Sequence, residues 1–204
     1  VLHNRLLVSA QFPDIFREMR VQHIASSYQR LLNALEGPAR EAAAGHTPRI
    51  VLLTAGPYSE TWFEQAYLAR YLGLPLVEGG DLTVRGERLY LKTVAGLEPV
   101  HGLLRRVDDD WCDPLVLRPD STLGVPGLVE AARAGHVVMA NALGSAFLES
   151  PAIQGFLPGI ARQVLGEKLL MPSLPTWWCG EPAAWADVKE HLDGKLLRST
   201  FPEG

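Results

Sequence analysis

The sequence predicts an α/β fold with a mostly parallel sheet, one β-hairpin and flanking helices at both ends. In residues 48–82 an apolar run, a Gly-Pro turn, an amphipathic helix and a second apolar run form the pattern of a βαβ unit. The segment "LTVRGERLYLK", residues 82–92, alternates on both sides of Arg85-Gly86-Glu87 and predicts the hairpin. Helical periodicity dominates before residue 46 and in the last third of the chain.

The N-terminal segment predicts two or three helices. In "SAQFPDIFREMRVQHIASSYQRLLNALEGPAREAAAG" apolar residues recur every three or four positions, at Ile24, Tyr28, Leu31 and Leu35. Gly37 and Gly45 are predicted helix stops. We therefore expect a helical segment, residues 1–46, that packs on a main α/β domain, residues 47–204.

The main domain continues in a regular order of elements. The helix of the βαβ unit has Thr61 and Glu64 in the positions of a capping box. After the hairpin, "VHGLLRRV" predicts a strand, "LGVPGLVEAARAG" a helix that ends at Gly135, and "HVVMANALG" another strand. The last third predicts one interrupted helix, an extended proline-rich segment and a final helix over residues 182–192.

Composition excludes several classes of protein. The chain has 204 residues, 47% of them hydrophobic and 21% charged, which is typical of a soluble globular protein. A formal net charge of -4 argues against a nucleic-acid partner. The sequence has neither an apolar run that could span a bilayer nor a basic-then-apolar leader, so we expect a cytoplasmic protein without membrane contact. Cys112 and Cys179 are predicted to be buried and reduced.

Several common motifs are missing from the sequence. Because no two of the 19 glycines lie two positions apart, there is no G-x-G-x-x-G, and no G-x-x-x-x-G-K-[ST] occurs. The six histidines form no H-x-x-x-H and the two cysteines no C-x-x-C, which argues against a dedicated zinc site. The serines in "GPYSE" and "ALGSA" do not match G-x-S-x-G, the motif of many serine hydrolases.

Three loops at the ends of predicted strands are the candidate sites, because open α/β sheets bind ligands there. The first is "TAGPYSE", residues 54–60, which contains Gly56 and Tyr58. Its turn leads into a helix N-terminus, whose free N–H groups could hold an anion. The alternative interpretation is a tight βα connection with a helix cap.

The second loop is "LLRRVDDDWCDP", residues 103–114, which follows an apolar strand. In extended backbone Arg106, Asp108 and Asp110 project to one side and Arg105, Val107 and Asp109 to the other. A guanidinium beside two acids could bind a carboxylate or phosphate, or hold an amine. Alternatively, Asp108 to Asp110 cap the following helix and form a structural network with the arginines.

The third loop is "NALGSAF", residues 141–147. Asn141 directly follows a predicted strand and could form a hydrogen bond to a ligand, and the Gly144-Ser145 backbone could line the same crevice. The alternative is that Asn141 stabilises a local turn.

Five segments together carry a resemblance to a known family: "RVQHIASSYQRLL", "VLLTAGPYSETWFEQAYLARYLGLPLVEGGDL", "RRVDDDWCDPL", "GVPGLVEAARAGHVVMANALGS" and "MPSLPTWWCGEP". In this order they resemble the middle of the circularly permuted ATP-grasp proteins of type 2, the glutathionylspermidine-synthase-like group. The resemblance implies a Rossmann-like, pre-ATP-grasp domain. It also implies a parent enzyme that activates a carboxylate as an acyl phosphate and passes it to an amine.

The resemblance also implies parts that this chain lacks. A metal-binding Glu-x-Asn strand is expected shortly before "HNRLLVSAQFP", and a lysine with a Gly-rich phosphate loop near "LLRSTFPEG", where Arg198 occupies the lysine's place. We therefore expect an excised central segment that binds no cofactor and catalyses nothing alone. ATP and magnesium are expected for the full-length parent. The expected partners are the parent's other ATP-grasp segments and a small carboxylate, amine or peptide substrate.

Under this resemblance Arg105 or Arg106 would hold an acidic substrate or the transferring phosphoryl group, and Asp108 and Asp110 would orient that arginine or the amine. A rival interpretation is a non-catalytic module that recognises a peptide or protein within a degenerate ATP-grasp protein. The arginine at Arg198 favours this rival mildly, although an arginine can also bind phosphate. An independent Rossmann-like nucleotide binder has only the order of elements in its favour.

Overall fold

Three helices precede the first strand, in agreement with the sequence. The structure, a computed structural model, describes residues 2–201. The helices are α1 (Leu2–Gln11), α2 (Pro13–Glu18) and α3 (Ala25–Ala42). The predicted stop at Gly37 is wrong, because α3 continues through Gly37 and Pro38. Its apolar face extends past that point to the buried Ala39, so packing outweighs the two helix-breaking residues.

A four-stranded parallel sheet forms the centre of the first unit. Its strands are β1 (Ile50–Thr54), β2 (Leu76–Val77), β6 (Gly102–Arg106) and β7 (Val138–Ala140), in the order β2-β1-β6-β7. Helix α4 (Trp62–Leu72) connects β1 to β2, and α5 (Leu128–Arg133) connects β6 to β7. The two crossovers therefore leave the central β1–β6 pair in opposite directions along the sheet.

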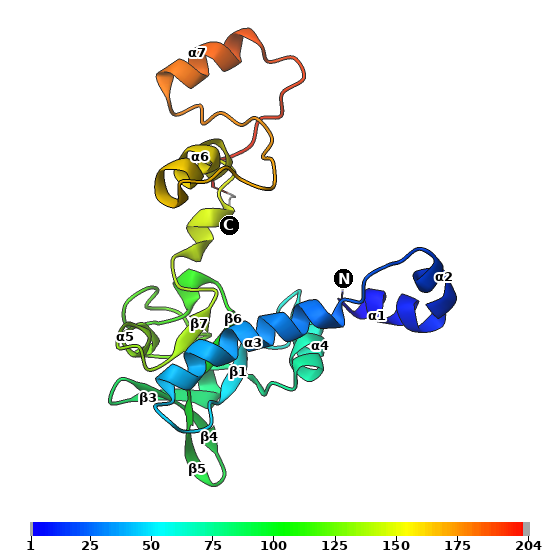
Figure 1. Ribbon diagram of the computed structural model, residues 1–204. Helices are drawn as coiled ribbons and strands as arrows, with labels where there is room; N and C mark the ends of the chain where they lie inside the picture. The colour runs from blue at the N-terminus through cyan, green and yellow to red at the C-terminus, as the bar shows by residue number, and fades with distance from the viewer. Residues whose placement is uncertain (1, 202–204) are drawn as a thin grey trace. The chain divides into compact units, whose positions relative to one another are not determined.

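Alternate residues of the central strands enter two separate cores. Val51, Leu53 and Leu103 pack with α5 and the hairpin region. Ile50, Leu52 and Leu104 pack with α1, α3 and α4. Figure 1 shows α3 lying across the parallel strands, and at Gly102 a Cβ would meet Ile50 Cγ1 at 2.9 Å.

The predicted hairpin is confirmed and belongs to a second, antiparallel sheet. It consists of β3 (Leu82–Arg85) and β4 (Arg88–Thr93), and its two turn residues, Gly86 and Glu87, have φ of 53° and 60°. A third strand, β5 (Gly96–Val100), pairs with β4 and was not predicted. It is an edge strand, which tolerates the proline at position 99.

Buried Asp113 holds the start of α5. Its carboxylate accepts hydrogen bonds from the backbone N–H groups of Leu115, Gly127 and Val129 at 2.9, 3.1 and 2.9 Å. The N–H of Val125 also donates to the carbonyl of Cys112 at 2.9 Å. The two ends of segment 114–126 are thus tied together beside the sheet.

Helix α4 begins after Thr61 as predicted, but the predicted capping box is absent. The Thr61 side chain makes no capping bond to the helix, and its hydroxyl instead accepts a hydrogen bond from Gln65 Nε2 at 2.7 Å. The reason is Gln65 itself, a buried polar residue that needs partners on the loop side of the helix.

The chain divides into two compact units, Val1–Leu143 and Gly144–Gly204. The second contains η3 (Ser145–Glu149), α6 (Ile153–Ile160) with a following π-helical turn η4 (Ala161–Leu165), and α7 (Pro182–Glu190). An interrupted helix, an extended segment and a last helix were predicted there. The predicted division into residues 1–46 and 47–204 stays a prediction. Among the described residues, no helix combines the length and apolar character needed to cross a membrane.

Candidate functional site

The candidate site lies at the carboxyl edge of the parallel sheet. The last residues of β1 and β6, Thr54 and Arg106, are partners in the sheet register. Because the following crossovers diverge from this pair, the edge between the two strands is the topological switch point, where open α/β sheets bind ligands. Gly56 follows β1 and Asn141 follows β7, so this edge gathers loops that the sequence predicted.

The loop after β1 is held by side chains of its own segment. Thr54 Oγ1 donates to Gln65 Oε1 at 2.5 Å and accepts from the Gly56 N–H at 3.1 Å. Gly56 has φ +91°, which favours glycine. The Tyr58 side chain is fully exposed. The interpretation of this loop as a tight βα connection therefore has direct support, while Tyr58 remains accessible to a ligand.

Glu78 is a polar residue at this edge that the sequence analysis missed. A Cβ on Gly56 would lie 3.2 Å from the Glu78 carboxyl, so the carboxylate sits against the glycine. It also accepts a bond from the backbone N–H of Asp81, while the Asp81 carboxylate accepts from the Glu78 N–H at 2.9 Å. Glu78 directly follows β2, so the rule that selected the other loops would have found it.

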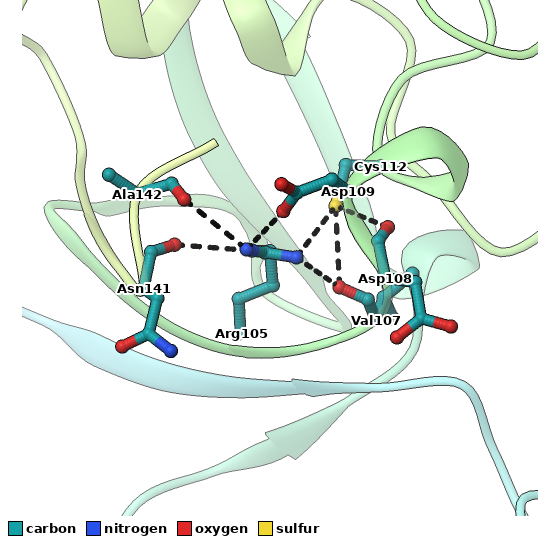
Figure 2. A network of polar contacts seen from close by, with 7 residues as sticks. All are labelled: Arg105, Val107, Asp108, Asp109, Cys112, Asn141 and Ala142. Atoms are coloured by element: carbon teal, nitrogen blue, oxygen red, sulfur yellow. Dashed lines mark hydrogen bonds and ion pairs between the residues drawn. The ribbon is translucent and has the colours of Figure 1, made fainter. Parts of the chain in front are cut away.

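Arg105 is enclosed by its neighbours. Figure 2 shows its guanidinium between Asp109 and the Val107 carbonyl on one side and the carbonyls of Asn141 and Ala142 on the other. The guanidinium donates to Val107 O at 2.6 Å, Asn141 O at 3.2 Å and Ala142 O at 3.4 Å. Its side chain is only 8% exposed and that of Asp109 14%. Arg105 thus fixes the end of β6 to the loop after β7.

The acid that pairs with Arg105 is Asp109, not Asp108 or Asp110. This agrees with the predicted alternation, which placed Arg105 and Asp109 on the same side. Asp108 and Asp110 are exposed. Asp108 precedes the short 3-10 turn η2 (Asp109–Trp111), but its side chain makes no capping bond, so the predicted cap is absent. A three-residue turn offers few backbone N–H groups to cap.

The two cysteines differ. Cys112 is buried and its thiol donates to the Asp108 carbonyl at 3.2 Å. Burial raises the pKa of Cys112 to about 11, against the lowering effect of nearby Arg105. Cys179 is exposed, so its predicted burial is wrong, since the apolar residues beside it in "TWWCGE" are themselves partly open to solvent.

Arg106 points to the other side of β6, into a pocket of about 210 Å³. The pocket is bounded by α1, α3, α4 and the end of β6. Its lining residues are Leu2, His3, Asn4, Tyr28, Phe63, Glu64, Tyr67, Leu68 and Arg106. Within residues 2–201, neither Arg106 nor Glu64 forms an ion pair. Sequence analysis did not find this pocket, because α1 lies far from β6 in the sequence.

Aromatic rings form one wall of this pocket. The His3 ring meets the rings of Phe63 and Tyr67 edge-on, with centroids 5.5 and 4.8 Å away, and Phe63 stacks on Tyr67 at 6.3 Å. Phe63 is 62% exposed, so much of its ring is available for contact.

The remaining predicted residues lie in the second unit. Gly144, with φ +86°, precedes η3, and Ser145 is the first residue of that turn. Arg198 is exposed in an irregular segment near the C-terminus. The end of the predicted Gly-rich stretch, residues 202–204, lies outside the described residues. Within residues 2–201, no group of three His, Cys, Asp or Glu side chains could hold a metal ion.

Comparisons with known proteins identify a family and several longer relatives. The family described as circularly permuted ATP-grasp type 2 matches residues 1–204. The uncharacterized protein Rv2567 of Mycobacterium tuberculosis is 40% identical over 197 residues, which cover 97% of this chain and 22% of the relative. The uncharacterized protein sll0335 of Synechocystis is 37% identical over 204 residues, 100% of this chain and 42% of the relative. The chain thus spans less than half the length of these relatives.

Proposed function

Because the chain belongs to the circularly permuted ATP-grasp type 2 family, we propose that it forms the substrate side of an ATP-dependent carboxylate–amine ligase. The observation that carries this proposal is Arg106, an exposed cation without an ion-pair partner among the described residues, at the switch point of a parallel sheet. An anionic substrate gains most from a cation that the protein itself leaves unneutralised.

In the proposed reaction Arg106 holds the substrate carboxylate or the phosphoryl group transferred to it. Asp108 and Asp110, exposed in the loop that follows, receive the amine. Arg105 acts as a positioning residue, because its ion pair with Asp109 and its bonds to carbonyls fix the loop. Holding two reactants in this way lowers the entropic part of the barrier.

Other predicted residues complete the proposed crevice. Gly56 allows the loop after β1 to turn sharply, and Tyr58 offers an exposed ring and hydroxyl. Asn141 presents its side chain next to a backbone carbonyl already bound by Arg105. The Gly144-Ser145 backbone belongs to the second unit, and its role in lining the substrate path stays a prediction.

We propose that other segments of a longer protein bind ATP and magnesium, as membership of the family implies. Among the described residues, no group of three acidic, histidine or cysteine side chains could hold a metal ion. When bound, ATP would supply the phosphoryl group that activates the carboxylate. Arg198, exposed in the second unit, is the residue of this chain that we propose contacts its phosphates. We propose that the isolated 204-residue chain does not catalyse this reaction alone.

A test compares the full-length natural protein that carries this chain with its Arg106→Ala variant. ADP release with Mg-ATP and a panel of amines and carboxylates is the readout. We expect kcat/KM to fall about a hundredfold, since a lost charge contact to the reacting groups has an effect of that order. Arg70→Ala, an exposed arginine on α4 outside the pocket, is the matched control.

The alternative function is a non-catalytic module that recognises a peptide or protein partner. Arg198 in the place of the expected lysine favours it. Isothermal titration of the full-length protein with Mg-ATP separates the two: binding supports the ligase, and its absence, with no ADP release, supports the module. Equal turnover of the Arg106→Ala variant would contradict the proposed role of Arg106.

A further inference from the structure

We propose that the pocket between α1, α3, α4 and the end of β6 binds a free α-amino acid with an apolar side chain. The carboxylate of the ligand would face Arg106, its ammonium group Glu64, and its side chain the rings of Phe63 and Tyr67. The inference rests on the proposed function for the ligand's role as a substrate. The binding itself follows from the pocket.

The charges of the pocket lead to this class of ligand. Arg106 and Glu64 line the same small space, yet neither forms an ion pair within residues 2–201. A ligand with one charge would leave the opposite charge of the pocket uncompensated as water is displaced. A zwitterion compensates both, and each contact becomes a charge-assisted hydrogen bond.

The aromatic wall of the pocket indicates that the ligand has an apolar side chain. The rings of His3, Phe63 and Tyr67 form one cluster, and Leu2 and Leu68, which line the same pocket, are each 4% exposed. An apolar side chain would cover ring surface that Phe63 now exposes to water. An ammonium group near these rings would gain further from their negative faces.

The size of the pocket limits the ligand. At about 210 Å³ it is smaller than the roughly 300–1,000 Å³ typical of drug-sized ligands. A single amino acid is suited to this space. The position of the pocket also agrees with a ligand site. Arg106 ends β6 at the switch point, and Phe63 and Glu64 lie in the first turn of α4.

The test measures binding by the full-length natural protein to L-phenylalanine and to two analogues that each lack one charge. N-acetyl-L-phenylalanine has no ammonium group, and phenethylamine has no carboxylate. Isothermal titration should show saturable binding of L-phenylalanine. The Kd of each analogue should be higher by about tenfold or more, since each analogue loses a contact to a charged group.

Two variants assign the contacts. Glu64→Gln should bind L-phenylalanine and its N-acetyl analogue with similar Kd, and Arg106→Gln should do so for L-phenylalanine and phenethylamine. Both residues are exposed, so the variants should fold, and unchanged thermal unfolding checks this. Arg70→Gln and Glu41→Gln are exposed controls outside the pocket and should keep the natural preference.

The outcomes separate this inference from the proposed function. Absence of saturable binding of L-phenylalanine and L-leucine would overturn the inference, as would equal Kd values for L-phenylalanine and both analogues. Binding with the expected charge preference, but without ADP release in the presence of any amine, would leave the inference standing and reject the ligase. ADP release that needs Arg106, together with no saturable binding of an amino acid, would reject the inference and leave the ligase standing.

Discussion

Arg105 and Arg106 are neighbours in the sequence and have opposite surroundings. Arg105 lies on the α5 side of β6, with a side chain 8% exposed, an ion pair with Asp109 and bonds to three carbonyls. Arg106 lies on the α4 side, is exposed and opens into a pocket. The alternation of a β-strand has thus given one arginine a structural role and left the other available for a ligand.

The same difference extends to the surroundings of the two arginines. On the α5 side, Asp113 accepts three backbone hydrogen bonds and the Cys112 thiol donates to a carbonyl. On the α4 side, Glu64 has no ion-pair partner among the described residues, and Phe63 is largely open to water. Polar groups that are satisfied within the protein stabilise the fold, whereas those left open define a binding surface.

Among the substitutions considered, Arg105→Met should destabilise the protein most. The substitution removes the guanidinium that pairs with the Asp109 carboxylate, which is only 14% exposed, and we expect a loss of about 3–5 kcal/mol in the free energy of unfolding. Urea unfolding followed by circular dichroism measures it. Arg106→Met is the matched control and should change the same free energy by about 0.5 kcal/mol or less. Similar losses for both variants would show that the two arginines are equivalent.

A smaller effect is expected at Cys112. Its pKa of about 11, against an ordinary value of 9.0, lowers the thiolate fraction about a hundredfold. At pH 8 Ellman's reagent should therefore label exposed Cys179 rapidly and Cys112 only after unfolding. Because the pKa of Cys112 is raised in the folded state, the protonated thiol contributes its full stabilisation to that state below pH 9.0. This contribution is lost as the pH rises toward 11.

Cys112→Ala identifies the slow thiol. In this variant the slow phase of labelling should disappear while the fast phase stays unchanged. Rapid labelling of both thiols in the native protein would mean that the α5 side opens as readily as the surface.

A second ion pair, more exposed than that of Arg105, should contribute least to stability. Arg49 and Glu98 are 2.6 Å apart, but their side chains are 39% and 37% exposed. Water screens such a pair, so Glu98→Gln should cost only about 0.5 kcal/mol, and less at high salt. A loss as large as that of Arg105→Met would show that burial does not distinguish the two pairs.

Local patterns were enough to predict the order of the elements. The βαβ unit of residues 50–77 and the hairpin with Gly86 at its turn were predicted, because period and turn chemistry are local properties. The predictions were wrong where tertiary contacts determine the local structure. Gly37 does not end α3, since Ala39 packs on the sheet, and Thr61 forms no cap, since Gln65 competes for its hydroxyl.

The candidate site was predictable only in part. Strand alternation placed Arg105 and Asp109 on the same side, but the turn that brings their charges together depends on packing. The pocket beside Arg106 joins His3 and Tyr67, which are separated by 64 positions (67 − 3), to a strand still further along the chain. No local sequence pattern indicates that these residues lie close together in the fold. The roles of Asp108, Asp110, Asn141 and Arg198 stay predictions.

The bonds made by Asp113 have a consequence for protein engineering. They fasten α5 to the end of β6 independently of the intervening residues, whose tip at positions 115–120 is exposed. Loop-closure entropy grows slowly with length, so extra residues at this tip should cost little. A fluorescent reporter or affinity tag inserted there would be attached to a rigid anchor close to the β6 end of the sheet, without altering a strand.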